Sequence, residues 1–200
     1  MRPNPKTFIA MLITYTEKEV LEQLRLSAGL PVYATEPNEE LADTTDKELL
    51  ARFRLEYYHA LNTAPLEELP VTEAGWKMQG RYTGTCRVEF EVPDNVARIV
   101  SLKMNEWEES VREVHPAVGS LYLRQQHSKV RATPRRPLMF RHADRLIVCG
   151  VLPGKPGGKV LAESLRVVEP AADGSFTLSP ALMQYAIDNA AGGRVPCAGK

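Results

Sequence analysis

The chain has 200 residues, with 25 basic and 25 acidic side chains and therefore a formal net charge of zero. Apolar residues make up 44% and charged residues 25%, which is ordinary for a globular protein and enough for one sizeable core. This composition excludes a disordered chain, a collagen-like repeat and a scaffold held by many disulfides. The longest apolar run falls far short of the roughly 20 residues that cross a bilayer. We therefore expect neither a membrane span nor a signal peptide.

Three segments combine a helix start signal with an apolar face at helical spacing. The predicted helices cover 17–28, 46–62 and 180–191. The first two begin with a capping box, and the third begins with an N-cap serine followed by proline. These start residues are Thr16 with Glu19, Thr45 with Glu48, and Ser179 with Pro180. Gly29 stands where the first helix requires a C-terminal cap.

Between these helices the pattern is typical of strands. Residues 87–92 alternate polar and apolar side chains with period two. Further strands are predicted at 96–104, 107–114, 138–141, 145–149 and 159–168. Short turns connect most of them, including Asn105-Glu106 before the returning segment 107–114, so the pairing should be antiparallel. An earlier apolar segment, Phe8–Tyr15, is either a buried strand or the first turns of a helix.

The predicted fold class is α+β, a helical bundle with a mostly antiparallel β insertion and a C-terminal helix. Residues 1–75 form the N-terminal helical part, and residues 76–170 form the β-rich insertion. Residues 171–200 supply a helix that packs on the N-terminal helices and a flexible tail.

No residue pattern in the chain predicts catalysis or a metal site. The three cysteines, Cys86, Cys149 and Cys197, include no Cys-x-x-Cys pair. We expect reduced thiols, with Cys86 and Cys149 facing a core from strands. The glycine-rich segment 154–159 lacks the spacing and hydroxyl of a phosphate-binding loop. The four histidines are scattered, and no nucleophile motif is present. We therefore predict no enzyme, no metal, no disulfide and no cofactor.

Charge is distributed unevenly along the chain. Residues 1–75 hold 7 basic and 13 acidic side chains, and residues 76–200 hold 18 and 12. Within 115–145 there are seven basic residues and one acidic residue. Such a block can contact phosphates, form a solvated loop or pair with another chain. These three interpretations remain open at this stage.

Several short motifs over residues 92–191 form a pattern similar to that of the head-to-tail adaptor proteins of tailed bacteriophages. They are a strand ending in Val92-Pro93-Asp94-Asn95, the Asn105-Glu106-Trp107 turn, Ser120-x-Tyr122, Arg136-Pro137 and the helix start Ser179-Pro180-Ala181-Leu182. Val92 stands where the adaptor pattern has leucine, and the first helix lacks the tryptophan-led opening often found there. The resemblance implies a helical bundle interrupted by a β insertion.

The resemblance also implies a structural virion protein in the neck of the particle. Its partners would be further copies of itself in a ring, the portal protein and the tail proteins, with DNA passing through the ring unread. Opposite charges on the two flanks of a subunit would favour head-to-tail contacts within the ring. The candidate interface residues are Glu36, Glu39, Glu40, Asp43, Trp107, Arg124, Lys129, Arg131, Arg135 and Arg136.

Two other functions remain as alternatives. One is a nucleic-acid-associating accessory domain that uses the basic 115–145 segment on a β platform. The other is a small enzyme or ligand-binding domain whose site is assembled from residues far apart in the sequence. If the protein is not viral, we expect it in the cytoplasm.

Overall fold

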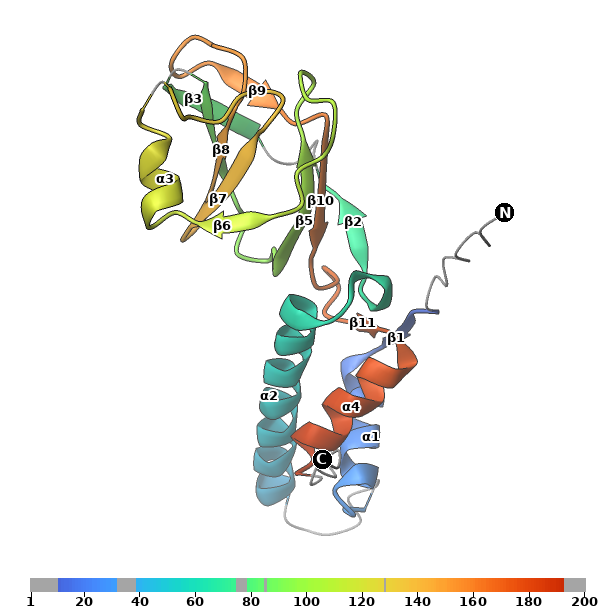
Figure 1. The fold of residues 1–200 in the computed structure, drawn as a ribbon. Coiled ribbons are helices and arrows are strands. Elements are labelled where there is room, and N and C mark those ends of the chain that lie inside the picture. The colour runs from blue at the N-terminus through green and yellow to red at the C-terminus, as the bar shows by residue number, and fades with distance from the viewer. Residues whose placement is uncertain (1–10, 32–38, 75–78, 85, 128, 193–200) are drawn as a thin grey trace, which may run out of the picture. The chain divides into compact units, whose positions relative to one another are not determined.

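The computed structural model describes residues 11–31, 39–74, 79–84, 86–127 and 129–192, and for residues 39–43 it describes the backbone alone. The fold class is α+β, as predicted. The chain divides into two compact units. The helical unit comprises residues 1–70 and 170–200, and the β unit comprises residues 71–169 (Figure 1).

The helical unit is built on α1 (Glu17–Ser27), α2 (Glu39–Thr63) and α4 (Pro180–Ala190). Helix α4 packs against both α1 and α2, so the end of the chain completes the bundle that its beginning starts (Figure 1). A short antiparallel ribbon pairs β1 (Ile13–Tyr15) with β11 (Phe176–Leu178). A single 3-10 turn, η1 (Leu66–Glu68), follows α2.

Aromatic packing connects the ribbon to α2. The ring of Phe176 lies edge-on to Phe53 at 5.0 Å and to Tyr57 at 5.1 Å between centroids. Phe53 and Tyr57 are one helical turn apart, which brings both side chains to the same face of α2. All three residues are buried, and α4 adds Met183 and Ile187 to the core of this unit.

The predicted caps of the first and last helices are confirmed. Thr16 and Glu19 form the complete capping box at the start of α1. The Ser179 hydroxyl accepts a hydrogen bond from the backbone N–H of Leu182, with Pro180 in the first helical position. Gly29 adopts a positive φ of 71° just beyond α1.

The predicted start of the second helix is wrong. Helix α2 begins at Glu39, so Thr45 lies inside it and not at its N-cap. The physical reason is the helix dipole, because carboxylates near a helix N-terminus are favourable. The acidic residues Glu39, Glu40 and Asp43 therefore suit the first turns of this helix.

The β unit contains two sheets. In the three-stranded sheet, β10 (Ser164–Val168) lies between β2 (Val71–Glu73) and β5 (Arg98–Lys103). The six-stranded sheet has the order β6 (Val114–Pro116), β7 (Leu138–His142), β8 (Arg145–Cys149), β4 (Arg87–Glu91), β3 (Gln79–Gly84) and β9 (Lys159–Leu161). Every pairing is antiparallel except that of β6 with β7, which is parallel.

The main core of the β unit includes side chains from both sheets. It contains Val88, Phe90, Met139, Leu146 and Val148 from the six-stranded sheet and Ile99, Leu102, Leu165 and Val167 from the three-stranded sheet. A second, smaller core is formed by the residues that alternate with these along β7 and β8, and so lies on the other face of the six-stranded sheet. It includes Phe140, Ile147 and Cys149. Strands β7 and β8 are therefore covered on both faces, which explains the nearly continuous apolar sequence of β8.

Two strand predictions differ from the structure. Residues 107–114 do return antiparallel to β5, but only through the bridge between Val111 and Leu102, so they form no extended hairpin strand. The side chain of Trp107 is instead buried in the main core of the β unit. The predicted strand 159–168 is two strands, β9 and β10, which belong to different sheets.

The strands that enter and leave the β unit are neighbours in one sheet. Val71 at the start of β2 pairs with Val168 at the end of β10. The carboxylate of Glu73 in β2 adds two hydrogen bonds to β10. It accepts from the Leu165 N–H (2.6 Å) and from the Ser164 hydroxyl (3.0 Å). The β unit thus has adjacent ends and a core of its own, which are the properties of an inserted domain.

We predict that residues 71–169 fold when they are expressed alone. The expected result is a β-type circular dichroism spectrum and one cooperative transition in urea. The matched control is a fragment that ends at residue 163 and lacks β10, the central strand of the three-stranded sheet. That fragment should show no cooperative transition, and a non-cooperative 71–169 fragment would contradict the prediction.

Candidate interaction surface

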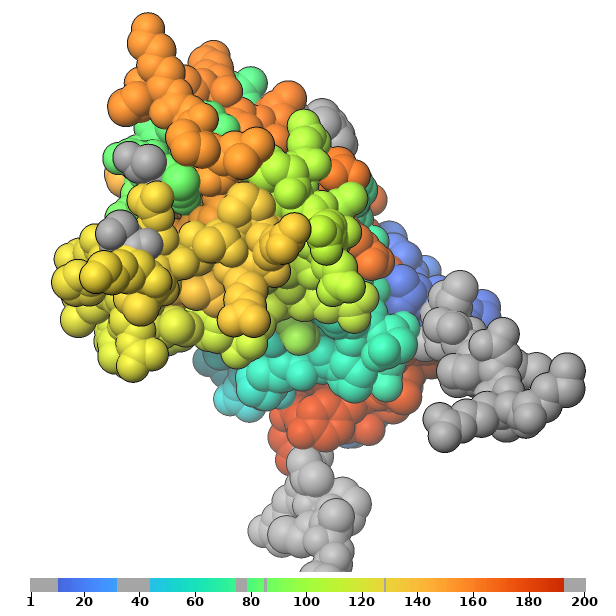
Figure 2. Space-filling view, turned by 45° about the horizontal axis from the view of Figure 1, so that its top comes forward, coloured from blue at the N-terminus to red at the C-terminus, as the bar shows by residue number. Residues whose placement is uncertain are grey.

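The basic segment folds into a compact projection of the β unit that we call the α3 lobe, residues 117–136. It begins with α3 (Ser120–Arg124) and continues through successive backbone turns, including Gln126 N–H to Leu123 O (3.1 Å) and Val130 N–H to His127 O (3.1 Å). Figure 2 shows the lobe as the yellow spheres gathered at one margin of the β unit.

A glutamine side chain holds the lobe together. Gln125 donates through its amide to the Leu121 carbonyl (3.0 Å) and accepts the backbone N–H of Ala132 (2.7 Å). The end of the lobe is thereby tied back to α3. A surface fixed in this way loses little conformational entropy when a partner binds.

The inner side of the lobe packs on the second core. The ring of Tyr122 meets Phe140 of β7 edge-on, with centroids 5.2 Å apart. Leu121 packs there as well, beside the buried residues Ala117 and Ala132. Because α3 directs these residues toward the sheet, its remaining side chains are left on the outside.

A tight turn at Thr133–Arg136 closes the lobe. The Arg136 N–H donates to the Thr133 carbonyl (2.9 Å), and Pro134 occupies the second position, where its fixed φ suits a β-turn. Arg135 and Arg136 are both exposed. The turn therefore presents two adjacent guanidinium groups on a short, closed piece of backbone.

Gly150 fixes the position of this turn. Its φ of 90° lies in a region that suits glycine, and a Cβ there would lie 2.6 Å from the Thr133 carbonyl oxygen. Its N–H donates to the Cys86 carbonyl (3.1 Å), and its carbonyl accepts the indole N–H of Trp107 (2.9 Å). Gly150 thus joins the basic turn, the β4 side of the sheet and the main core.

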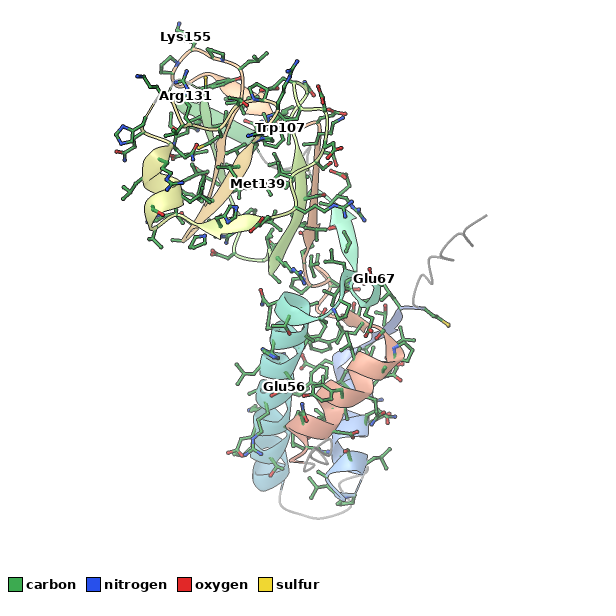
Figure 3. The ribbon with its side chains drawn as sticks, viewed as in Figure 1. Glu56, Glu67, Trp107, Arg131, Met139 and Lys155 are labelled. Atoms are coloured by element: carbon green, nitrogen blue, oxygen red, sulfur yellow. The ribbon has the colours of Figure 1, made fainter. Side chains whose placement is uncertain are left out.

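The structure corrects the role predicted for Trp107. The residue is 3% exposed and belongs to the main core of the β unit (Figure 3). Its hydrogen bond to Gly150 satisfies the buried indole N–H. Trp107 is therefore a core residue and provides no surface for a partner.

The predicted basic residues are all placed in the α3 lobe. They are Arg124, Lys129, Arg131, Arg135 and Arg136. All are exposed except Arg131, which is half-buried at the margin of the β unit (Figure 3). Within the described part of the chain, no carboxylate forms an ion pair with any of the five.

The structure describes the predicted acidic interface residues only in part. Glu36 lies outside the described residues. Glu39, Glu40 and Asp43 lie in the first turns of α2, and their side chains are outside the description. Asp46, in the same stretch, makes a bidentate ion pair with Arg25 of α1, with Nε to Oδ1 at 2.9 Å. Its charge is therefore already compensated within the helical unit.

Three exposed aliphatic residues of the lobe were not singled out from the sequence. Leu123 is 55% exposed, Val130 is 58% exposed and Val118 is 68% exposed. In the chain, Leu123 precedes Arg124, and Val130 lies between Lys129 and Arg131, so the exposed side chains of the lobe are both basic and apolar. No sequence period could reveal this face, because α3 has only five residues and the rest of the lobe is irregular.

A small cavity of about 180 Å³ lies beside the lobe, lined in part by Cys86, Cys149, Arg87 and Tyr122. The guanidinium carbon of Arg87 lies 5.7 Å from the centre of the Tyr122 ring, and the guanidinium binds Glu89. The expectation for Cys149 holds, since it is buried at the end of β8. The expectation for Cys86 is wrong, because it is half-buried in a turn with a φ of 62°. Cys197 lies outside the described residues.

An open concavity of about 730 Å³ covers the β3–β4 side of the six-stranded sheet. Two arginines and four carboxylates line it, namely Arg81, Arg145, Glu89, Glu91, Asp94 and Asp144. Glu89 also accepts from Arg145 at 3.3 Å. This mixed set of charges does not select a ligand of one sign.

Over the described ranges, no three His, Cys, Asp or Glu residues come together in a way that could hold a metal ion. No helix in those ranges has the length and apolar character that a membrane span requires. The α3 lobe is therefore the best-defined candidate for a functional surface.

Comparison with known proteins adds no family. No protein-family model matches this chain, and no curated protein matches it.

We predict that Gly150→Ala destabilises the protein much more than Gly157→Ala. Both glycines have positive φ, 90° and 78°, but a Cβ at Gly157 would meet nothing within 4 Å. The control should lose about 1–2 kcal/mol of unfolding free energy from backbone strain alone. Gly150→Ala should lose roughly 3 kcal/mol or more, because the turn at Thr133 must also shift. Urea unfolding followed by circular dichroism measures both, and equal losses would contradict the close approach.

We also predict that the Cys149 thiol is unreactive at pH 8. Burial raises the pKa of Cys149 to about 11, an effect that the nearby Arg87 only partly offsets. The thiolate, which is the reactive form, is therefore scarce until the pH approaches 11. Alkylation by iodoacetamide at pH 8, followed by peptide mass spectrometry, should be roughly a hundredfold slower in the folded protein than in urea. Cys86 provides an internal reference, and equal rates in folded and unfolded protein would contradict the prediction.

Proposed function

We propose that this protein is a ring-forming head-to-tail adaptor of a tailed bacteriophage. In this role it is a structural protein of the virion neck that joins the portal to the tail and surrounds the DNA passage. The observation that carries the proposal is the architecture: a helical bundle is interrupted by a β domain and is completed by a C-terminal helix. The sequence resemblance implies this arrangement.

The pairing of Val71 with Val168 supports the insertion. The chain enters and leaves the β unit through two adjacent strands, and the residues before and after them belong to one compact helical unit. A ring subunit with two such parts can use them for different contacts. One part can face a neighbour in the ring while the other faces the portal or the tail.

The distribution of charge supports a head-to-tail contact between copies. A closed ring requires two different but complementary surfaces on each subunit. The chain is neutral overall, with an acidic excess in residues 1–75 and a basic excess in residues 76–200. The exposed cations of the α3 lobe have no ion-pair partner among the described residues. They are therefore free to meet an acidic surface of the next subunit.

The proposal predicts a closed oligomer of one discrete mass. Sedimentation velocity should give this mass at low salt, and negative-stain imaging should show rings. Arg135→Glu combined with Arg136→Glu should weaken assembly at 50 mM salt by roughly tenfold, because exposed ion pairs contribute about 0–1 kcal/mol each. The loss should shrink at 500 mM salt, where screening already operates.

The control carries the same change in net charge outside the lobe. Arg112→Glu combined with Arg166→Glu alters two exposed arginines of the β unit. This variant should assemble like the wild type. A wild-type chain that remains monomeric at all concentrations would refute the proposed ring, and equal weakening by both double variants would refute a specific role of the lobe's charges.

A further inference from the structure

The outer face of the α3 lobe has the composition of a protein interface. An interface typically has an apolar centre within a polar rim, with arginine enriched and lysine depleted. Leu123 and Val130 are each more than half exposed. The five cations of the lobe are four arginines and one lysine, three of them next to Leu123 or Val130 in the chain, and residues 117–136 contain no acidic residue.

Several contacts hold the lobe on the sheet. The Gln125 side chain links Leu121 of α3 to Ala132, and the Thr133 carbonyl lies close to the α-carbon of Gly150. The inner residues Leu121 and Tyr122 pack on the second core and hold α3 to the sheet. Contacts that are already made in the free subunit reduce the conformational entropy lost when a partner binds.

We infer that Leu123 and Val130 form the apolar centre of the contact with a second copy of this chain, against its acidic helical unit. This inference rests on the proposed function, and it assigns the apolar contact to exposed residues, since Trp107, a predicted interface residue, is buried. Charge complementarity selects the occupant, since the helical unit, residues 1–70 and 170–200, holds 14 acidic and 9 basic side chains. Leu123 and Val130 supply attraction that salt does not screen, and the surrounding cations set the register.

A nucleic-acid contact fits this face less well. Phosphate groups attract cationic side chains, but they offer exposed aliphatic side chains no apolar surface to pack against. Val118, Leu123 and Val130 are exposed in the same segment as the cations that such a contact would use. They gain free energy only when another apolar surface covers them.

The test compares two double variants of the full chain by sedimentation velocity over a range of concentrations. Leu123→Asp with Val130→Asp places two charges in the lobe. Leu152→Asp with Leu161→Asp places two charges elsewhere on the β unit, at residues that are 55% and 52% exposed. The lobe variant should raise the dissociation constant by about a hundredfold or more, and the control should change it by less than about threefold. The apolar part of the effect should persist at 500 mM salt, unlike the effect of the Arg135/Arg136 reversal, and the uncharged pair Leu123→Ser with Val130→Thr measures it without added charge.

Thermal unfolding establishes that the lobe variant is folded, and Leu123→Ser with Val130→Thr is a milder second pair that should weaken assembly in the same direction. If both lobe variants assemble as the wild type does, the inference fails while the proposed ring stands. If the wild type is monomeric, both fail. If the lobe variants assemble normally but lose binding to a 30-base-pair duplex, the lobe is a nucleic-acid surface and the inference is overturned.

Discussion

The close approach at Gly150 is the constraint on which the β unit depends. At this residue β8 ends, the Trp107 indole closes the main core, and the backbone of the Thr133–Arg136 turn lies against the α-carbon. Its N–H also reaches the Cys86 carbonyl, beside the start of β4. Cys86, Trp107 and the Thr133–Arg136 turn, which are far apart in the sequence, therefore meet at Gly150, where a side chain would clash. Only a residue without a Cβ, at a φ of 90°, allows this convergence.

This convergence explains why the basic segment is a surface and not a loose loop. Strand β8 is covered on one face by the main core and on the other by the lobe's inner residues, of which Tyr122 contacts Phe140. Once the inner side of α3 is committed to that packing, Leu123 and Arg124 have no place except outside. Exposed aliphatic and cationic side chains are therefore a consequence of how the lobe is anchored. The function that we propose uses the side of the lobe that the fold leaves uncovered.

Each of the two units has a hydrophobic core of its own. The helical unit buries the aromatic residues of α2 against Phe176 and closes with α4, while the β unit buries its own core between two sheets. The paired strands β2 and β10 connect the two. In the ring that we propose, the acidic excess of residues 1–75 and the basic excess of residues 76–200 would attract one copy to the next. Exposed ion pairs contribute little free energy, so an assembly also requires apolar contact, which Leu123 and Val130 can provide.

The sequence by itself determined the elements whose signals are local. The capping box at Thr16, the Ser179-Pro180 start and the alternation in 87–91 each depend on residues within one or two turns, and the structure agrees with all three. The sequence also identified the basic residues that the structure places in the lobe. Only the tertiary structure decided the burial of Trp107, the parallel pairing of β6 with β7 and the division of 159–168 between two sheets. These features depend on partners far away in the chain: Gly150 for the indole, β7 for β6, and β5 for β10. The candidate surface belongs with them, because Leu123 and Val130 are exposed only as a result of what the lobe packs against.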